Sequence, residues 1–88
     1  MTKEARMSLA SCLRGVAFIK KQSRQYTPDW DHDHCAACWT KFAEWDGPDI
    51  LHDGYATTAE YDRGEDYDWV CPTCFDELRD EMGWRLVE

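Results

Sequence analysis

The 88-residue sequence lacks a long apolar run and any segment typical of a secretory signal. Its most apolar stretch, residues 9–19, is interrupted by Ser11, Arg14 and Gly15. This stretch is too short to span a membrane and is not followed by a cleavage site of small residues. Internal repeats and low-complexity segments are also absent, and the length leaves no room for a second core. We therefore expect a cytoplasmic protein without a membrane partner.

A chain this short buries little apolar surface, and such domains often need a disulfide or a metal ion as a cross-link. Five cysteines are present, and four of them form two C-x-x-C pairs. In a reducing cytosol, such pairs bind metal more often than they form disulfides. Zinc prefers four tetrahedral ligands, and the two-residue spacing lets both cysteines of a pair face one ion. The sequence therefore predicts one structural zinc ion bound by Cys35, Cys38, Cys71 and Cys74, with Cys12 left as a buried apolar residue of the first helix.

A closed shell of four protein ligands leaves no position for a reacting water molecule, so we expect a chain that is not an enzyme. Two alternatives at the cysteine pairs stay open. A histidine, His34 or His52, could replace one cysteine, or a pair could be redox-active, although the βαβ context of redox pairs is missing. The spaced aspartates Asp29, Asp31 and Asp33 suggest a calcium loop, but its sixth and twelfth positions lack the required glycine and glutamate.

Charge divides the chain into two parts. Residues 29–88 contain 17 acidic and four basic residues, a net charge of −13, whereas residues 1–28 carry +5 and the whole chain carries −8. We accordingly distinguish a basic N-terminal helical segment, residues 1–28, from an acidic zinc-binding domain, residues 29–88. Within the basic segment we expect a helix over residues 3–14 that ends at Gly15, followed by a strand over residues 16–19. One helix that continues through Gly15 is the alternative.

The remaining elements indicate an α+β fold. Strands are predicted over residues 50–59 and 66–71 with a turn over residues 61–66, and Pro72 opens a helix that Gly83 ends. A cysteine knuckle, a hairpin and a helix whose first turn provides the last two ligands form a treble clef. A zinc ribbon would place the second pair on another hairpin. We therefore predict a small treble-clef-like or zinc-ribbon-like α+β domain with an N-terminal helix, a β-hairpin and a C-terminal helix.

Aromatic residues are abundant, with five Trp, four Tyr and three Phe. One group flanks the zinc-binding elements and is expected in the core: Trp39, Phe42, Trp69, Phe75 and Trp84. A second group lies among acidic residues and is expected to be partly exposed: Trp30, Trp45, Tyr55, Tyr61 and Tyr67. Aromatic and acidic side chains together suit the binding of a basic protein surface.

The run Asp31-His32-Asp33-His34-Cys35-x-x-Cys38-Trp39-x-x-Phe42 is followed by Gly54-Tyr55, by Trp69-Val70-Cys71-x-x-Cys74-Phe75 and by Trp84. This pattern, which covers about residues 29–85, resembles a group of small, acidic, uncharacterised bacterial proteins. The resemblance implies a cytosolic bacterial protein with a zinc knuckle. Small acidic proteins of this sort are sometimes immunity partners that neutralise a toxin, which gives a functional analogy.

We therefore expect a non-enzymatic protein-interaction module of the immunity type, which binds a basic toxin or nuclease. The residues expected to contact that partner are Asp29, Asp31, Glu44, Asp46, Asp62, Glu65, Asp66 and Asp68. One alternative is nucleic-acid binding through the basic N-terminal segment, which is disfavoured because the acidic body repels phosphates. Another is a treble-clef nuclease that uses residues 31–34, but the helix after Cys74 offers no His or Asn to complete its metal site.

Overall fold

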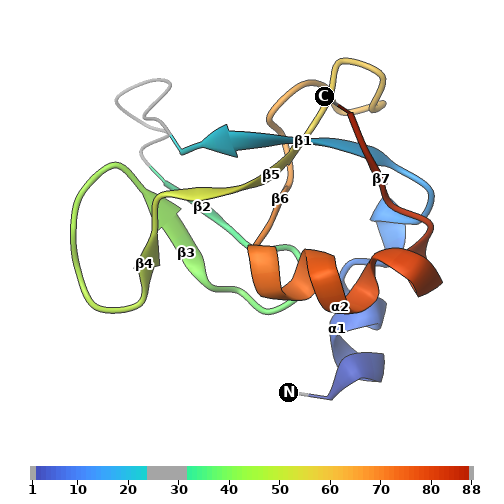
Figure 1. Ribbon diagram of the computed structural model, residues 1–88, viewed down its shortest axis with the longest axis horizontal. Coiled ribbons are helices and arrows are strands. Elements are labelled where there is room, and N and C mark those ends of the chain that lie inside the picture. Colours follow the sequence, from blue (N-terminus) through green and yellow to red (C-terminus); the bar gives the residue numbers. More distant parts are fainter. Residues whose placement is uncertain (1, 24–31, 88) are drawn as a thin grey trace.

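The computed structural model describes residues 2–23 and 32–87, which form two α-helices and two small sheets (Figure 1). In chain order the elements are α1 (Lys3–Leu9), the 3₁₀ turn η1 (Ser11–Leu13), β1 (Ala17–Gln22), β2 (His32–His34), β3 (Lys41–Ala43), β4 (Ile50–Leu51), β5 (Asp53–Thr57), β6 (Trp69–Val70), α2 (Pro72–Met82) and β7 (Arg85–Leu86). One sheet has the strand order β6-β5-β1-β7 and the other the order β2-β3-β4. The predicted α+β class, with an N-terminal and a C-terminal helix, is confirmed. No helix in the described part of the chain is long and apolar enough to cross a membrane.

The first helix is shorter than predicted, because the chain tightens into η1 after Leu9. This turn directs Ala10 and Leu13 into the core, where both are fully buried. Gly15 then adopts the expected left-handed conformation, with a φ of 76°, and β1 follows. The alternative of one helix through Gly15 is therefore wrong. The prediction that Cys12 is buried is also wrong, because η1 leaves this residue exposed while its neighbours turn inward.

Strand β1 lies inside the four-stranded sheet, between β5 and β7. Its Phe18 is opposite Thr57 in the antiparallel pair with β5 and opposite Leu86 in the parallel pair with β7. The indole Nε1 of Trp84 donates to the carbonyl oxygen of Leu13 at 2.9 Å, so the end of the chain also closes over η1. The basic N-terminal segment and the acidic remainder of the chain therefore share one sheet and one core.

The stretch predicted as one strand over residues 50–59 divides between the two sheets. β4 pairs with β3, whereas β5 pairs with β1 and with β6. Gly54 lies where the sheets approach one another, since a Cβ atom there would be 2.5 Å from Cε1 of the buried Phe42. β6 is shorter than predicted, because the backbone N–H groups of Tyr67 and Asp68 donate to the side-chain hydroxyl of Thr57 rather than to backbone carbonyl oxygens of β5.

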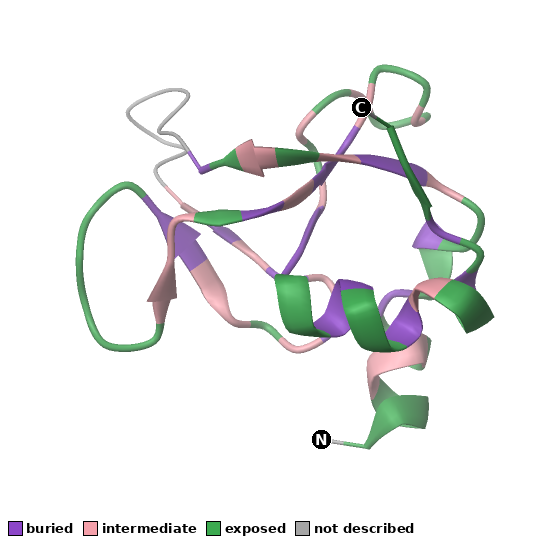
Figure 2. Ribbon diagram, in the orientation of Figure 1, coloured by how far each residue is buried: buried purple, intermediate pink, exposed green. Residues whose placement is uncertain are grey.

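Helix α2 packs on the four-stranded sheet through one face (Figure 2). Phe75, Leu78 and Met82 on that face are fully buried, and the Phe75 ring stacks on Tyr55 with a centroid distance of 4.0 Å. As predicted, the helix begins at Pro72 and ends where Gly83 takes a left-handed conformation. Because β6, an edge strand of the four-stranded sheet, leads directly into α2, the first turn of the helix is held at that edge, which positions the cysteines described next.

Candidate metal centre

Four cysteine sulfur atoms converge between the β2–β3 turn and the start of α2. The Sγ atoms of Cys35, Cys38, Cys71 and Cys74 all lie within 4.8 Å of one another, and none is in a disulfide. Zn–S bonds of about 2.3 Å in a tetrahedron place sulfur atoms about 3.8 Å apart. The Sγ atoms of Cys38 and Cys71 are 3.7 Å apart. The fold thus brings all four predicted ligands together, and they could hold one four-coordinate metal ion.

The first cysteine pair comes from the turn between β2 and β3. The N–H of Cys35 donates to the Thr40 carbonyl oxygen at 2.8 Å, and the N–H of Trp39 donates to the Cys35 carbonyl oxygen at 2.9 Å. The N–H of Ala36 donates to the carbonyl oxygen of Trp69 at 2.8 Å. Because Trp69 belongs to β6, which leads directly into the second pair, this bond holds the two pairs at a defined separation.

The second pair opens α2. Cys71 is the residue before the first helical turn, and its Sγ accepts the N–H of Cys74 at 3.4 Å. The N–H of Cys71 in turn donates to Sγ of Cys35 at 3.3 Å. Free N–H groups and the helix dipole both favour negative charge at a helix N-terminus. This end of α2 is therefore suited to sulfur atoms that carry charge as thiolates.

The other two sulfur atoms each have a polar side chain beside them. Oγ1 of Thr40 lies 3.2 Å from Sγ of Cys38, and Nη1 of Arg6 donates to Sγ of Cys74 at 3.6 Å. Every sulfur atom of the cluster thus has one polar neighbour besides the other sulfurs. Contacts of this kind orient metal ligands and spread the negative charge of a four-thiolate site.

The ionisation of the cluster shows why it suits a cation. The pKa of Cys35 is lowered to about 2, because the thiols of Cys71 and Cys74 donate to its thiolate. The same hydrogen bond raises the pKa of Cys71 to about 12, and the bonds to Cys35 and Cys71 together with burial raise the pKa of Cys74. Cys71 and Cys74 therefore keep their protons while Cys35 is ionised, so the buried sulfurs are not all charged at once. A divalent ion would replace those protons, because it stabilises thiolates directly.

Arg6 connects α1 to the cluster and to α2. Its side chain is 14% exposed and also forms an ion pair with Glu77, with 2.6 Å between Nη1 and Oε1. Its pKa is raised because it donates to both Cys74 and Glu77. The cluster therefore has a permanent positive charge beside it, supplied by the N-terminal segment.

Other cations of the basic segment also contact the acidic remainder of the chain. Lys3 pairs with Glu81 at 2.7 Å, and Arg14 donates to the backbone carbonyl of Glu81 at 3.0 Å. Lys21 pairs with Asp66 at 2.7 Å. The basic and the acidic parts of the sequence thus contact one another within the fold.

The histidine alternatives are not supported at the cluster. The ring of His34 packs on that of Trp39 at 4.9 Å, and burial followed by the nearby His32 and Lys41 lowers the pKa of His34. His52 instead lies beside Asp46, 3.3 Å away. Within residues 2–23 and 32–87, the four cysteines form the only group of three or more side chains placed to bind a metal.

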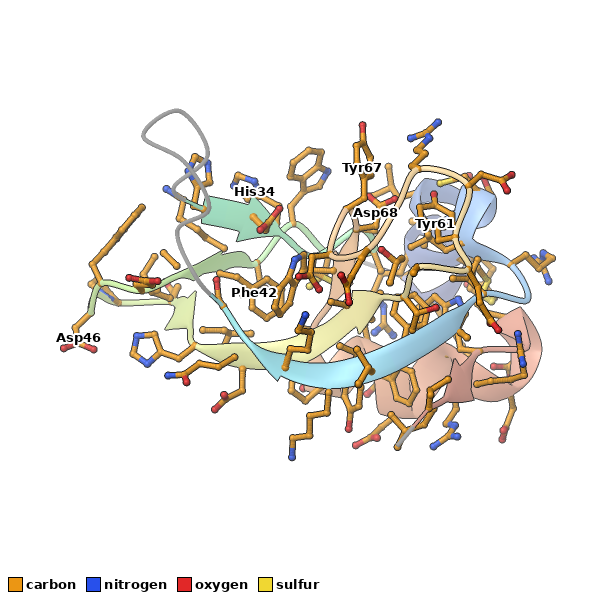
Figure 3. All side chains as sticks on the ribbon, turned by 90° about the horizontal axis from the view of Figure 1, so that it is seen from above. His34, Phe42, Asp46, Tyr61, Tyr67 and Asp68 are labelled. Atoms are coloured by element: carbon orange, nitrogen blue, oxygen red, sulfur yellow. The ribbon has the colours of Figure 1, made fainter. Side chains whose placement is uncertain are left out.

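The six acids of the predicted partner surface that the structure describes lie in two separate places. Glu44 and Asp46 are on the β3–β4 loop, whereas Asp62, Glu65, Asp66 and Asp68 are on the β5–β6 loop. Figure 3 shows Asp46 at one end of the molecule, far from Asp68. Asp29 and Asp31 lie outside the described residues.

Two acids of the β5–β6 loop have partners within the fold. Asp66 is paired with Lys21, and Asp68 accepts the hydroxyl of Tyr61 at 2.9 Å. Burial and this hydrogen bond raise the pKa of Tyr61. Asp62 and Glu65 remain exposed. The β5–β6 loop thus combines acids that support its own shape with acids that face solvent.

One aromatic prediction is wrong. Phe42, Trp69, Phe75 and Trp84 are buried as expected, but Trp39 is 61% exposed. Its backbone has a φ of 67°, which turns the side chain out of the knuckle. Sequence patterns around a C-x-x-C pair do not reveal this, since the left-handed conformation depends on how the turn closes.

Fold and site together define a small α+β domain with a four-cysteine cluster that could hold a metal ion. No protein-family model, curated protein or solved structure matches the chain.

Proposed function

We propose that this chain is a non-enzymatic, zinc-stabilised protein-interaction module that binds a basic protein. The observation that carries the proposal is the closed cluster of four cysteine sulfurs, each with a polar neighbour. A site with four protein ligands has no open position for substrate, and such sites stabilise folds rather than catalyse reactions. The function then belongs to the surface that the cluster holds in place.

Zinc is the metal that this donor set suits best. Tetrahedral four-sulfur sites hold zinc or iron, and a fold of this size gains from metal binding because binding energy is folding energy. Protein purified from its native host should contain one zinc ion per chain by elemental analysis, and chelation should abolish most of the helical signal in far-UV circular dichroism. A folded, metal-free protein would contradict the proposal.

The proposed partner is a basic protein because the chain is strongly acidic. Four thiolates around a divalent ion carry −2, so the metal-loaded chain is near −10. A field of this sign accelerates encounter with a basic protein and repels nucleic-acid phosphates. The analogy to immunity proteins suggests a cytoplasmic toxin or nuclease as the partner. The ion pairs of Lys3, Arg6 and Lys21 support this proposal over nucleic-acid binding, because those cations are already engaged.

Affinity capture at low salt, followed by binding measurements with the purified partner, tests this proposal. The double variant Asp62→Asn/Glu65→Gln removes two exposed charges of the β5–β6 loop, whereas Asp76→Asn/Asp80→Asn removes two exposed charges of α2 as a control. We expect a basic partner whose association slows several-fold with the loop variant and with added salt, and less with the control. If no basic protein binds even at low salt, the proposed function is wrong.

A further inference from the structure

Trp39 combines two unfavourable features. Its φ of 67° lies in the left-handed region. Glycine adopts this conformation readily, but any residue with a side chain loses free energy there. It also leaves 61% of its surface in contact with solvent, more than any other large apolar side chain among the described residues. Packing on His34 accounts for only part of its surface. Backbone strain that persists at an exposed aromatic residue is a reason to look for a function there.

Trp39 borders a surface groove of about 330 Å³ between the end of α1, strand β2 and the β5–β6 loop. Leu9 and Tyr67, which are 48% and 42% exposed, line the same groove. Figure 3 shows His34, Tyr67 and Asp68 along one side of the molecule, with the Tyr67 ring projecting away from the ribbon. Three large, partly exposed apolar side chains from distant parts of the sequence thus surround one concave surface.

The charge of the groove indicates which kind of chemical group would bind in it. The carboxylates of Asp33 and Asp68 line it beside the imidazoles of His32 and His34, and none of the described lining residues is a lysine or an arginine. Aromatic rings flanked by carboxylates attract a guanidinium or ammonium group together with its aliphatic stem. Tyr67 already has one such neighbour, since the guanidinium carbon of Arg63 lies 5.6 Å from its ring centroid.

From these features we infer that the groove between Trp39 and Tyr67 is the docking site for a basic segment of the partner protein, with Trp39 as its central anchor. The inference rests on the proposed function and adds the surface and the chemistry of the segment that it takes. The proposed contact joins a tryptophan of this chain to arginine or lysine of the partner. Tryptophan and arginine are among the residues that most often dominate the binding energy of protein interfaces. The knuckle that carries the metal ligands also presents the anchor, so metal binding positions the docking surface.

The test uses zinc-loaded protein and a phage-displayed random peptide library as the probe. Peptides selected on the wild type are expected to be rich in Arg and Lys. A synthetic copy should bind at least tenfold more weakly to Trp39→Gly, whereas the melting temperature of that variant should be equal or higher, because glycine relieves the strained φ. Trp45→Ala removes the other exposed tryptophan of the described residues, which lies outside the groove, and should bind within about twofold of wild type.

Trp39→Asn provides a second variant, because asparagine tolerates the left-handed conformation. In the wild type, the indole N–H signal of Trp39 should shift on peptide addition while that of Trp45 does not.

Selected peptides that are acidic or uncharged would overturn the inference. So would a wild-type dimer that Trp39→Gly converts to a monomer, since the groove would then take a second copy. Basic peptides that bind all variants equally would refute the groove and leave the proposed function standing, whereas failure to capture any basic protein would refute the proposed function itself.

Discussion

Replacement of Arg6 by glutamine should weaken the proposed binding of zinc without removing any of the four cysteines. The guanidinium is 3.6 Å from Sγ of Cys74 and largely shielded from solvent. At an effective dielectric constant of about 20, unit charges at that distance attract by about 5 kcal/mol before desolvation is subtracted. Measured hydrogen bonds to charged groups contribute about 1.5–3 kcal/mol. The ion pair with Glu77, which is 51% exposed, adds at most about 1 kcal/mol.

A loss of about 2 kcal/mol corresponds to a zinc affinity that is about 30-fold weaker. Competition for zinc with a chromophoric chelator measures this change. Lys3→Gln is the matched control, because it removes the same charge from the same helix but pairs only with the exposed Glu81. It should change zinc affinity by no more than about twofold. Equal zinc affinities of the Arg6→Gln and Lys3→Gln proteins would show that the contact with Cys74 has no energetic role.

Three other predictions concern the cluster and the core. Cys71→Ala should leave the chain largely unfolded at neutral pH even with added zinc, as monitored by circular dichroism, because an incomplete shell binds metal weakly. The raised pKa values of Cys71 and Cys74 mean that zinc must displace at least two protons, so its affinity should fall by at least about 100-fold for each unit that the pH decreases, and calorimetry in buffers of different ionisation enthalpy should detect the released protons. Gly54→Ala should destabilise the protein by about 1–3 kcal/mol in denaturant unfolding, because the new Cβ would overlap the buried Phe42 ring, whereas Gly47→Ala meets only an Ile50 side-chain carbon at 3.2 Å and should be nearly neutral.

Features that depend on neighbouring residues could be predicted from the sequence. The spacing within each C-x-x-C pair is a local requirement of metal coordination, so the four sulfurs could be assigned to one site before their positions were known. Helix α2 was equally predictable, because Pro72, Gly83 and the apolar positions between them signal its start, its end and its buried face. Gly15 marked the end of the first helical region, because glycine readily takes the left-handed conformation at which helices end.

Features that depend on contacts between distant residues could not be predicted. The stretch predicted as one strand over residues 50–59 is divided between two sheets, because β4 pairs with β3 whereas β5 pairs with β1 and β6. Cys12 is exposed because the core takes Leu13 instead. The six described acids assigned to one partner surface lie on two loops, β3–β4 and β5–β6, and Asp46 on the first is far from Asp68 on the second (Figure 3).

The sequence by itself therefore determined which four cysteines form the candidate metal site, the α+β class and the excess of negative charge, because each follows from composition or from spacing along the chain. Only the tertiary structure decided that Arg6 lies beside the cluster and that Trp39 faces solvent in the same groove as Tyr67. The physical reason is that both arrangements depend on how α1, the knuckle and the β5–β6 loop pack together, and packing between distant segments leaves no periodic signal in a single sequence.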